Sequence, residues 1–232
     1  MRNELNFHRY SALAPNTFDF TPAALVIAGW TGRDRAALEH HVAELEAIGV
    51  KRPSAMPVYY RVSTGMLTQS AEIQVLGPDS SGEAEPVLFS TSDGLWLGVG
   101  SDHTDRKLET VSVAMSKQVC AKVVSRELWD CREIAGHWDQ LILRSRIPGA
   151  NGASRPELYQ EGRLAQILSP QTLISGLTGQ DGLPVGTVMF CGTFAAIGGV
   201  RPAPWFEMEI EDPVLGRRLR HRYKIEVLPV VE

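Results

Sequence analysis

The 232-residue chain has few cysteines, no surplus of positive charge and no long apolar segment. Its three cysteines are odd in number and widely spaced, which favours a reducing compartment over a disulfide framework. Lys and Arg number 23 against 27 Asp and Glu, so the net charge of −4 argues against a nucleic-acid or anionic-membrane partner. No apolar run approaches the roughly 18 residues of a membrane-spanning helix, and the N-terminal MRNELNFHRY is too polar for a signal peptide. We therefore expect a cytoplasmic protein.

What is present indicates a globular, mostly β protein of the α+β class. The chain is 44% hydrophobic and 22% charged, and it is long enough to bury a core without help from a metal or a disulfide. From Pro57 onward, short apolar runs alternate with Gly, Pro, Ser and Asp, which is typical of strands joined by turns. The clearest of these runs cover residues 58–63, 71–76, 86–90 and 95–100.

Two parts of the chain differ in pattern. Residues 1–55 predict a small N-terminal α/β segment, with a strand over 22–30 and a helix over 34–49. Residues 56–232 predict a larger β domain that contains two helices and closes with a pair of strands. Its helices are expected over 103–119, with Leu108, Val111 and Met115 as the apolar face, and over 169–177.

Acidic residues gather around the two central strands of this β domain. Glu83 and Glu85 alternate along a strand and therefore project from the same face. Asp102 comes directly after the next strand, so three carboxylates converge if the two strands are neighbours. Like charges at that distance need a cation, and Mg²⁺, Mn²⁺ or Ca²⁺ would suit oxygen ligands. The alternative is a surface turn at 83–85 and a helix that begins with Ser101 or Asp102 as its N-cap.

Two neighbours of Asp102 have a chemical and a structural interpretation. His103 is a candidate general base beside the proposed ligand, or a solvent-facing residue in the first turn of a helix. Arg106 lies four residues after Asp102, where it would share a helix face with this aspartate and hold it in place.

The ordered set of motifs resembles fumarylacetoacetate hydrolase-family enzymes over about residues 56–228. That family has Glu-x-Glu before an apolar strand, as at Glu83 and Glu85, and later Asn-Asp-x-Ser/Thr-x-Arg-x-Leu-Gln, as in SDHTDRKLE at 101–109. A lysine, a Gln-x-Gly stretch, a helix and a Gly-Thr strand end follow in the same order. The matching residues are Lys122 or Lys117, YQEG at 159–162 with Gln160, LSPQTLISGL at 168–177, and LPVGTVMFCGT ending at Thr193. The whole sequence is also similar to a bacterial family known only as a domain of unknown function.

The resemblance implies a mixed β-roll that forms a homodimer, and an enzyme that acts on a small 2-oxo or 2,4-dioxo acid. Such enzymes carry out C–C hydrolysis, decarboxylation or tautomerisation, in which a cation and an ammonium stabilise an enolate-like oxygen. Glu83, Glu85 and Asp102 would hold Mg²⁺ or a similar ion. The implied catalytic residues are Lys122 or Lys117, with His103 and Glu109 as further candidates, and the substrate-binding residues are Arg106, Gln160 and Thr193.

Three departures from the family pattern bear on the reaction. Ser101 replaces an asparagine, and Glu109 replaces a glutamine, which adds a negative charge or supplies a base. Family hydrolases activate water with a His-Glu dyad, but residues 58–82 contain no histidine and only one glutamate, Glu72. The sequence therefore favours an isomerase or a decarboxylase over a hydrolase. The rival hypothesis is a non-catalytic small-molecule binding or dimerisation protein with the same fold.

Overall fold

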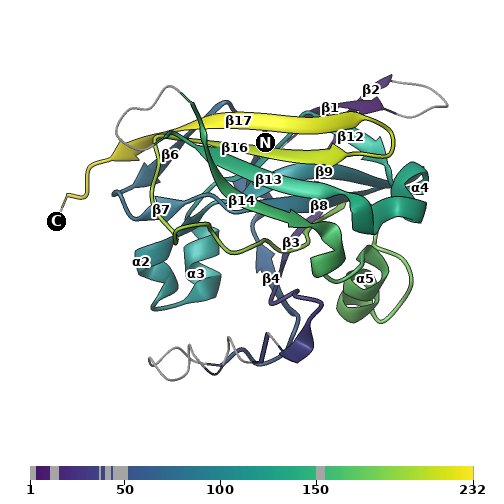
Figure 1. The fold of residues 1–232 in the computed structure, drawn as a ribbon, viewed down its shortest axis with the longest axis horizontal. Coiled ribbons are helices and arrows are strands. Elements are labelled where there is room, and N and C mark those ends of the chain that lie inside the picture. Colours follow the sequence, from purple (N-terminus) through teal and green to yellow (C-terminus); the bar gives the residue numbers. More distant parts are fainter. Residues whose placement is uncertain are drawn as a thin grey trace.

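Two β-sheets form the body of the protein, and the smaller sheet covers one face of the larger (Figure 1). The computed structural model describes residues 4–10, 16–36, 38–39, 43, 52–149 and 155–231. Buried side chains of the two sheets meet in one core, which includes Leu97 from the larger sheet and Phe206 and Met208 from the smaller. The expectation of a mostly β protein is confirmed.

The larger sheet has ten strands, of which eight run in the order β2-β1-β12-β9-β8-β15-β3-β4, while β11 pairs with β9 and β5. Their bounds are β1 Leu5–Tyr10, β2 Asn16–Phe20, β3 Ala24–Gly29, β4 Val58–Val62, β5 Leu67–Thr68, β8 Ala84–Thr91, β9 Gly94–Asp102, β11 Lys122–Val124, β12 Glu127–Asp130 and β15 Thr187–Phe190. Strands from the first 55 residues are part of this sheet, since β1 pairs with β12 and β3 pairs with β15 and β4.

The smaller sheet has five strands in the order β14-β13-β16-β17-β6. Their bounds are β14 Glu157–Arg163, β13 Ile142–Ile147, β16 Trp205–Asp212, β17 Arg217–Leu228 and β6 Glu72–Leu76. A short ribbon joins β7, Ser80–Ser81, to β10, Thr104–Asp105. The helices are α2 Arg106–Glu109, α3 Val113–Gln118, α4 Cys131–Ile134 and α5 Pro170–Thr178, with 3₁₀ turns at Thr64–Met66, Ala135–Gln140 and Leu164–Gln166.

The central strands are apolar on both faces, because one face of the larger sheet packs on the smaller sheet and the other forms a second core from the strands of the larger sheet itself. In β3, Val26 and Ala28 face the core shared with the smaller sheet. Leu25 and Ile27 point the other way, into a second core. This second core includes Phe7 of β1 and Phe89 of β8, whose rings meet edge to face. Continuous apolar runs in the sequence are therefore strands buried on two sides.

The helix predicted over 103–119 is wrong in its extent. The chain instead makes the β10 bridge and then two short helices, each with its own N-cap: Asp105 accepts from Leu108 N, and Ser112 accepts from Met115 N. Ser112 has extended backbone angles, so it ends one helix and begins the next. Val111 and Met115, predicted to face the core, are 78% and 56% exposed.

The other two helices predicted from the sequence have different outcomes. The helix predicted over 169–177 is confirmed as α5, with Ser169 as its N-cap and Pro170 in its first turn. Most of the helix predicted over 34–49 lies outside the described residues. None of the described helices has the length and hydrophobicity to cross a membrane. The three cysteines are free, and Cys120 and Cys191 are buried.

Candidate metal centre

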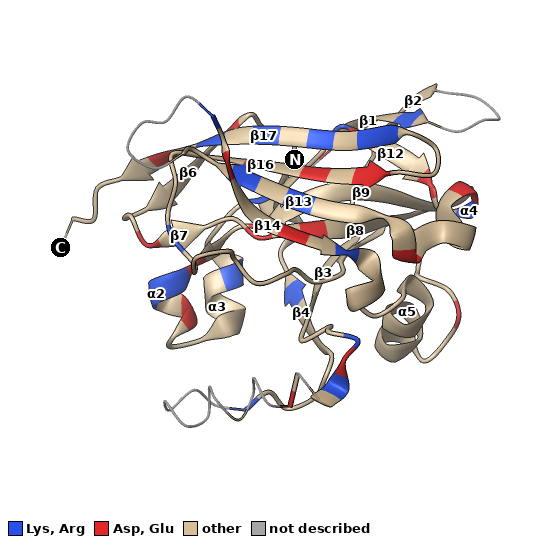
Figure 2. Ribbon diagram, in the orientation of Figure 1, with Lys and Arg blue, Asp and Glu red and all other residues tan. Residues whose placement is uncertain are grey.

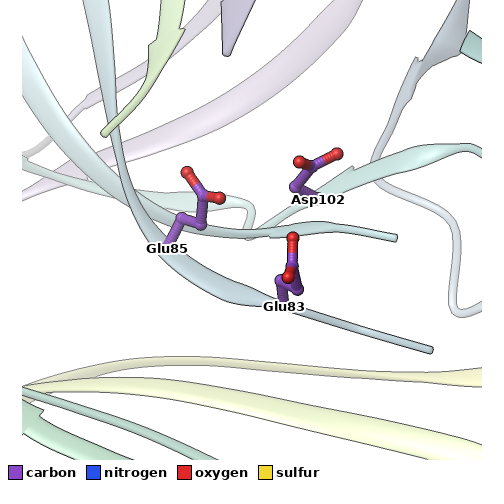
Figure 3. Close-up of side chains that lie close together, drawn as sticks. All are labelled: Glu83, Glu85 and Asp102. Atoms are coloured by element: carbon purple, nitrogen blue, oxygen red, sulfur yellow. The ribbon is translucent and has the colours of Figure 1, made fainter. Parts of the chain in front are cut away.

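The β8–β9 hairpin brings the three acidic side chains together. Its antiparallel register pairs Ala84 with Ser101, and the Asp102 N–H donates to the Glu83 carbonyl at 3.0 Å. Glu83 and Asp102 are therefore cross-strand neighbours, and Glu85 projects from the same side of the hairpin as Glu83. One oxygen of each carboxylate lies within 4.8 Å of one from each of the others. Figure 3 shows the three side chains grouped around a common space. The surface-turn alternative for Glu85 and Asp102 does not hold, because both are buried.

Asp102 is fully buried between two lysines. Lys117 of α3 forms an ion pair with Asp102 Oδ2, and Nζ of Lys122 in β11 lies 2.9 Å from Oδ1. Burial alone would raise the pKa of this carboxyl, but the two ammonium groups outweigh it and lower the pKa to about 2. The resemblance left open which lysine belongs to the site, and the structure places both there.

Glu83 lies at the solvent side of the cluster and has two cationic neighbours. Arg106 Nη1 is 3.0 Å from its Oε1, and Lys117 Nζ is 3.6 Å from its Oε2. The same Arg106 nitrogen contacts Glu109 at 2.9 Å. Arg106 therefore holds Glu83 and Glu109, and the expectation that it holds Asp102 is corrected. The reason is that Asp102 ends a strand, whereas the helix starts only at Arg106.

Glu85 is buried and makes no direct ion pair among the described residues, although the charge of Lys117 is near enough to act on it. Its Oε2 accepts from the Gly192 N–H at 2.7 Å, and its exposed fraction is 2%. Burial, followed by the charge of Asp102, raises the pKa of this carboxyl well above its ordinary value. The cluster thus has a buried carboxyl group without an ion pair among the described residues and a donor set made of oxygen alone, which fits a hard divalent cation.

Gln160 fixes the backbone between the two glutamates. Its Oε1 accepts from the Ala84 N–H at 3.0 Å and from Ser145 Oγ at 2.7 Å. Its Nε2 donates to Thr193 Oγ1 at 2.8 Å, and that hydroxyl donates to the Ala84 carbonyl at 2.7 Å. Thr193 is thus bonded to the backbone between Glu83 and Glu85, and its expected contact with a substrate stays a prediction. Gln160 is fully engaged with the protein, so its geometry fits positioning of Glu83 and Glu85 better than contact with a substrate.

His103 is wholly buried and points away from the carboxylates. Its Nε2 lies 2.9 Å from Ser80 Oγ and its Nδ1 2.9 Å from the Tyr223 hydroxyl, which donates to Ser101 Oγ. Because Tyr223 uses its proton on Ser101, Nδ1 carries the histidine proton and Nε2 accepts from Ser80. Burial, Lys122 and Arg106 lower the pKa of His103 to about 3. A neutral imidazole with both nitrogens engaged does not fit the role of a general base, and the solvent-facing alternative is also corrected.

Sequence reasoning missed Tyr223, which joins the smaller sheet to this network. It stands among the arginines of β17, which Figure 2 shows in blue beside the acidic residues of β16. Of these arginines, Arg218 pairs with Glu211 and Arg220 with Glu207. Tyr223 itself faces the core, as does Leu219 four residues earlier. The period-2 alternation of β17 was the available signal, because Leu219 and Tyr223 share one parity and are buried, whereas Arg218, Arg220 and Arg222 have the other parity and are exposed.

Two cavities of about 280 Å³ lie elsewhere on the molecule. One is lined by residues 135–140 and the start of α5, the other by β3, β4 and the end of α5. None of the three carboxylates lines either cavity.

Solved structures share this fold at low sequence identity. A yeast protein, ynq8 of the fumarylacetoacetate hydrolase family, superposes with a TM-score of 0.65 at 14% identity over 90% of this chain and 95% of its own. 2-Keto-3-deoxy-D-arabinonate dehydratase, solved with magnesium and 2,5-dioxopentanoate, gives 0.62 at 14% identity over 92% of this chain and 77% of its own. 4-Oxalocrotonate decarboxylase from Pseudomonas putida, solved with calcium and acetate, superposes with a TM-score of 0.51 at 16% identity. This match covers 88% of this chain and 76% of the decarboxylase chain.

These matches show that the β-roll predicted from the resemblance is the fold of the protein. No curated protein sequence matches the chain. Residues 28–223 match a family whose description is "Protein of unknown function (DUF2848)". The chain belongs to this DUF2848 family and has the fold of the fumarylacetoacetate hydrolase enzymes.

Proposed function

We propose that the protein is a divalent-cation-dependent enzyme acting on a small 2-oxo or 2,4-dioxo acid. The observation that carries the proposal is the cluster of Glu83, Glu85 and Asp102, whose oxygens lie within 4.8 Å of one another beside two lysines. The dehydratase and the decarboxylase of the same fold were solved with a divalent cation and a small oxo acid or carboxylate. The chemistry of the cluster and these relatives support the same class of ligand.

The three carboxylates would hold Mg²⁺, or Mn²⁺ or Ca²⁺ in its place, through oxygen ligands. When bound, the cation supplies positive charge to the oxygen on which an enolate develops. The solvent side of the cluster is formed by Glu83, Arg106 and Glu109, whose side chains are 19%, 19% and 30% exposed. We infer that the acid approaches from this side, where Arg106 can meet its carboxylate and Glu109 can exchange a proton. Lys122 or Lys117 would stabilise the developing negative charge, and Thr193 would contact the substrate.

We infer a reaction that passes through an enolate without an activated water. Residues 58–82 contain no histidine, and His103 is engaged on both ring nitrogens. Decarboxylation or tautomerisation, or dehydration as in the structural relative, needs only proton transfer and charge stabilisation at this site. Hydrolysis of a C–C bond is the less favoured alternative.

Isothermal titration of Mg²⁺ into chelator-stripped protein tests the proposal. We expect saturable binding that Glu85→Gln weakens at least tenfold, because the amide removes one of the three negatively charged oxygen ligands. Glu72→Gln changes an exposed acid of β6 and should leave binding unchanged. A screen of 2-oxo and 2,4-dioxo acids with the Mg²⁺-loaded protein follows, read as loss of the oxo-acid absorbance. Absence of Mg²⁺ and Mn²⁺ binding would contradict the proposal and favour a non-catalytic binding or dimerisation protein.

We also propose a homodimer, which the family resemblance supports. Sedimentation equilibrium should give twice the mass of one chain across the micromolar range. A single-chain mass at the highest concentration would contradict it.

A further inference from the structure

The ammonium of Lys117 lies inside the carboxylate cluster. It pairs with Asp102 Oδ2 and is 3.6 Å from Glu83 Oε2. Its side chain is only 7% exposed, and its Nζ lies 5.9 Å from the centre of the Tyr60 ring. Lys117 therefore forms ion pairs with oxygens of two of the three carboxylates that would bind a divalent cation.

Lys122 is placed differently. Its Nζ reaches the other oxygen of Asp102 and donates to the His103 carbonyl, and neither Glu83 nor Glu85 is among its ion-pair partners. Its strand is held on both sides, since Lys122 pairs with Asp102 of β9 and with Leu67 of β5. Lys117 comes instead from α3, a helix of six residues that follows the turn at Ser112. A flexible side chain on a short helix can leave the cluster more easily than one on an inner strand.

We propose that Lys117 is a built-in competitor of the divalent cation, so that the metal binds only as this ammonium leaves Asp102 and Glu83. The inference rests on the proposed function and concerns how that site is regulated. An ammonium and a divalent cation repel each other at a few ångströms, so they compete for the same two carboxylates. Lys117 balances the charge of Asp102 and Glu83 in the metal-free protein, and its departure sets the cation concentration at which the site fills.

Titration of Mg²⁺ into wild type and Lys117→Met tests this competition. We expect the variant to bind Mg²⁺ roughly tenfold more tightly or better, because the methionine keeps the bulk and removes the repelling charge. Lys107→Met removes an exposed lysine of α2 and should leave the affinity unchanged. Binding that appears only in Lys117→Met also supports the competition.

Two other results of that titration are distinguishable. Equal or weaker Mg²⁺ binding by Lys117→Met, with clear binding by wild type, overturns the competition and leaves the metal site standing. Absence of Mg²⁺ binding by both proteins overturns the proposed function and the competition together.

A second measurement uses wild type alone and does not depend on how a variant folds. Reductive methylation followed by mass spectrometry reports the accessibility of each lysine amine. Saturating Mg²⁺ should increase the labelling of Lys117 several-fold and leave Lys107 as it was. Unchanged labelling of Lys117 at a concentration that fills the site overturns the proposal.

Discussion

Glu85 is the acidic residue whose environment most disfavours its charge. It is buried, its neighbours include Asp102 and Glu83, and its one strong contact is the Gly192 N–H. Because its pKa is raised, the folded protein holds a proton at Glu85 that the unfolded chain releases near pH 4.5. Its contribution to stability is therefore present at low pH and is lost as pH rises above that value.

Glu85→Gln should consequently be more stable than wild type at pH 8 when both are free of metal, since the amide can still accept from Gly192. Adding Mg²⁺ should reverse the order. At a free Mg²⁺ concentration about 100-fold above Kd, binding raises the unfolding free energy of wild type by about 2.7 kcal/mol. The unfolding free energy of the variant should rise only a little. Thermal unfolding with and without chelator measures both effects. Equal stabilisation of the two proteins by Mg²⁺ would contradict the role of Glu85.

The buried, neutral state of His103 predicts how the stability of the protein changes at acidic pH. Its pKa is about 3 in the folded protein against about 6.5 in the unfolded chain. Below pH 6.5 the unfolded chain takes up a proton that the folded protein refuses, so stability falls as pH drops toward 3. Between pH 7 and 5, wild type should lose about 2 kcal/mol more unfolding free energy than His103→Gln.

Urea unfolding at the two pH values measures this loss. His8 is exposed, so His8→Gln should follow wild type. Parallel pH dependence of wild type and His103→Gln would show that His103 is not held neutral by the fold.

At the scale of elements, the metal centre depends on the loop that leaves β15. Gly192 in this loop has a φ of +103°, and a Cβ there would lie 1.8 Å from Thr31 Oγ1. The close approach to Thr31 brings the Gly192 N–H to Glu85, and the next residue, Thr193, bonds the Ala84 carbonyl. The Gly-Thr pair thus fixes the second glutamate from outside its own hairpin.

Gly192→Ala should destabilise the protein by about 1–3 kcal/mol from backbone strain alone, with a further cost from the contact with Thr31. It should also weaken Mg²⁺ binding. Gly199→Ala is the matched control, because Gly199 has a φ of +84° but no atom within 4 Å of an added Cβ. Thermal unfolding and titration calorimetry compare the two. If both variants bind Mg²⁺ as wild type does, the loop does not position Glu85.

The segment 103–119 shows where local pattern was insufficient. Apolar spacing favoured one helix, whereas the structure has the short strand β10 and two helices there. The competing signals were the side-chain caps Asp105 and Ser112, each of which starts a helix of its own. The break matters for the site, because it turns Lys117 back toward Asp102.

On the scale of the whole molecule, the site lies where the two sheets meet. The hydroxyl of Tyr223 in β17 donates to Ser101 Oγ of β9 and is also hydrogen-bonded to His103 Nδ1. Ser101 Oγ in turn accepts from the Glu83 N–H at 3.2 Å. The smaller sheet therefore helps to hold the backbone of a proposed ligand in the larger one. The second sheet is part of the site and does more than cover the core.

Tyr223→Phe removes one hydroxyl from this network and should cost about 1–3 kcal/mol of unfolding free energy. Because Glu83 loses part of its support, Mg²⁺ affinity should fall as well. Tyr10→Phe provides a comparison, since Tyr10 is 45% exposed and lies in an outer part of the larger sheet. A Tyr223→Phe protein with reduced stability and unchanged Mg²⁺ affinity would limit the residue to a structural role.

The sequence by itself determined the mostly β class, the strands around the acidic residues and the shared face of Glu83 and Glu85. These follow from alternation, turn residues and short apolar runs, which act over a few residues. The order of the family motifs further indicated Lys122, Lys117 and Thr193.

Only the tertiary structure decided which charged and polar groups of the site are paired with one another. It placed both lysines on Asp102 and gave Arg106 to Glu83 and Glu109. It also left Glu85 without an ion pair among the described residues and engaged both nitrogens of His103. Most of these outcomes depend on contacts between segments that are separate in the sequence, such as β8 with the loop after β15 and β9 with β17. Charge and burial at a buried site are set by neighbours in space, and local sequence pattern contains no information about them.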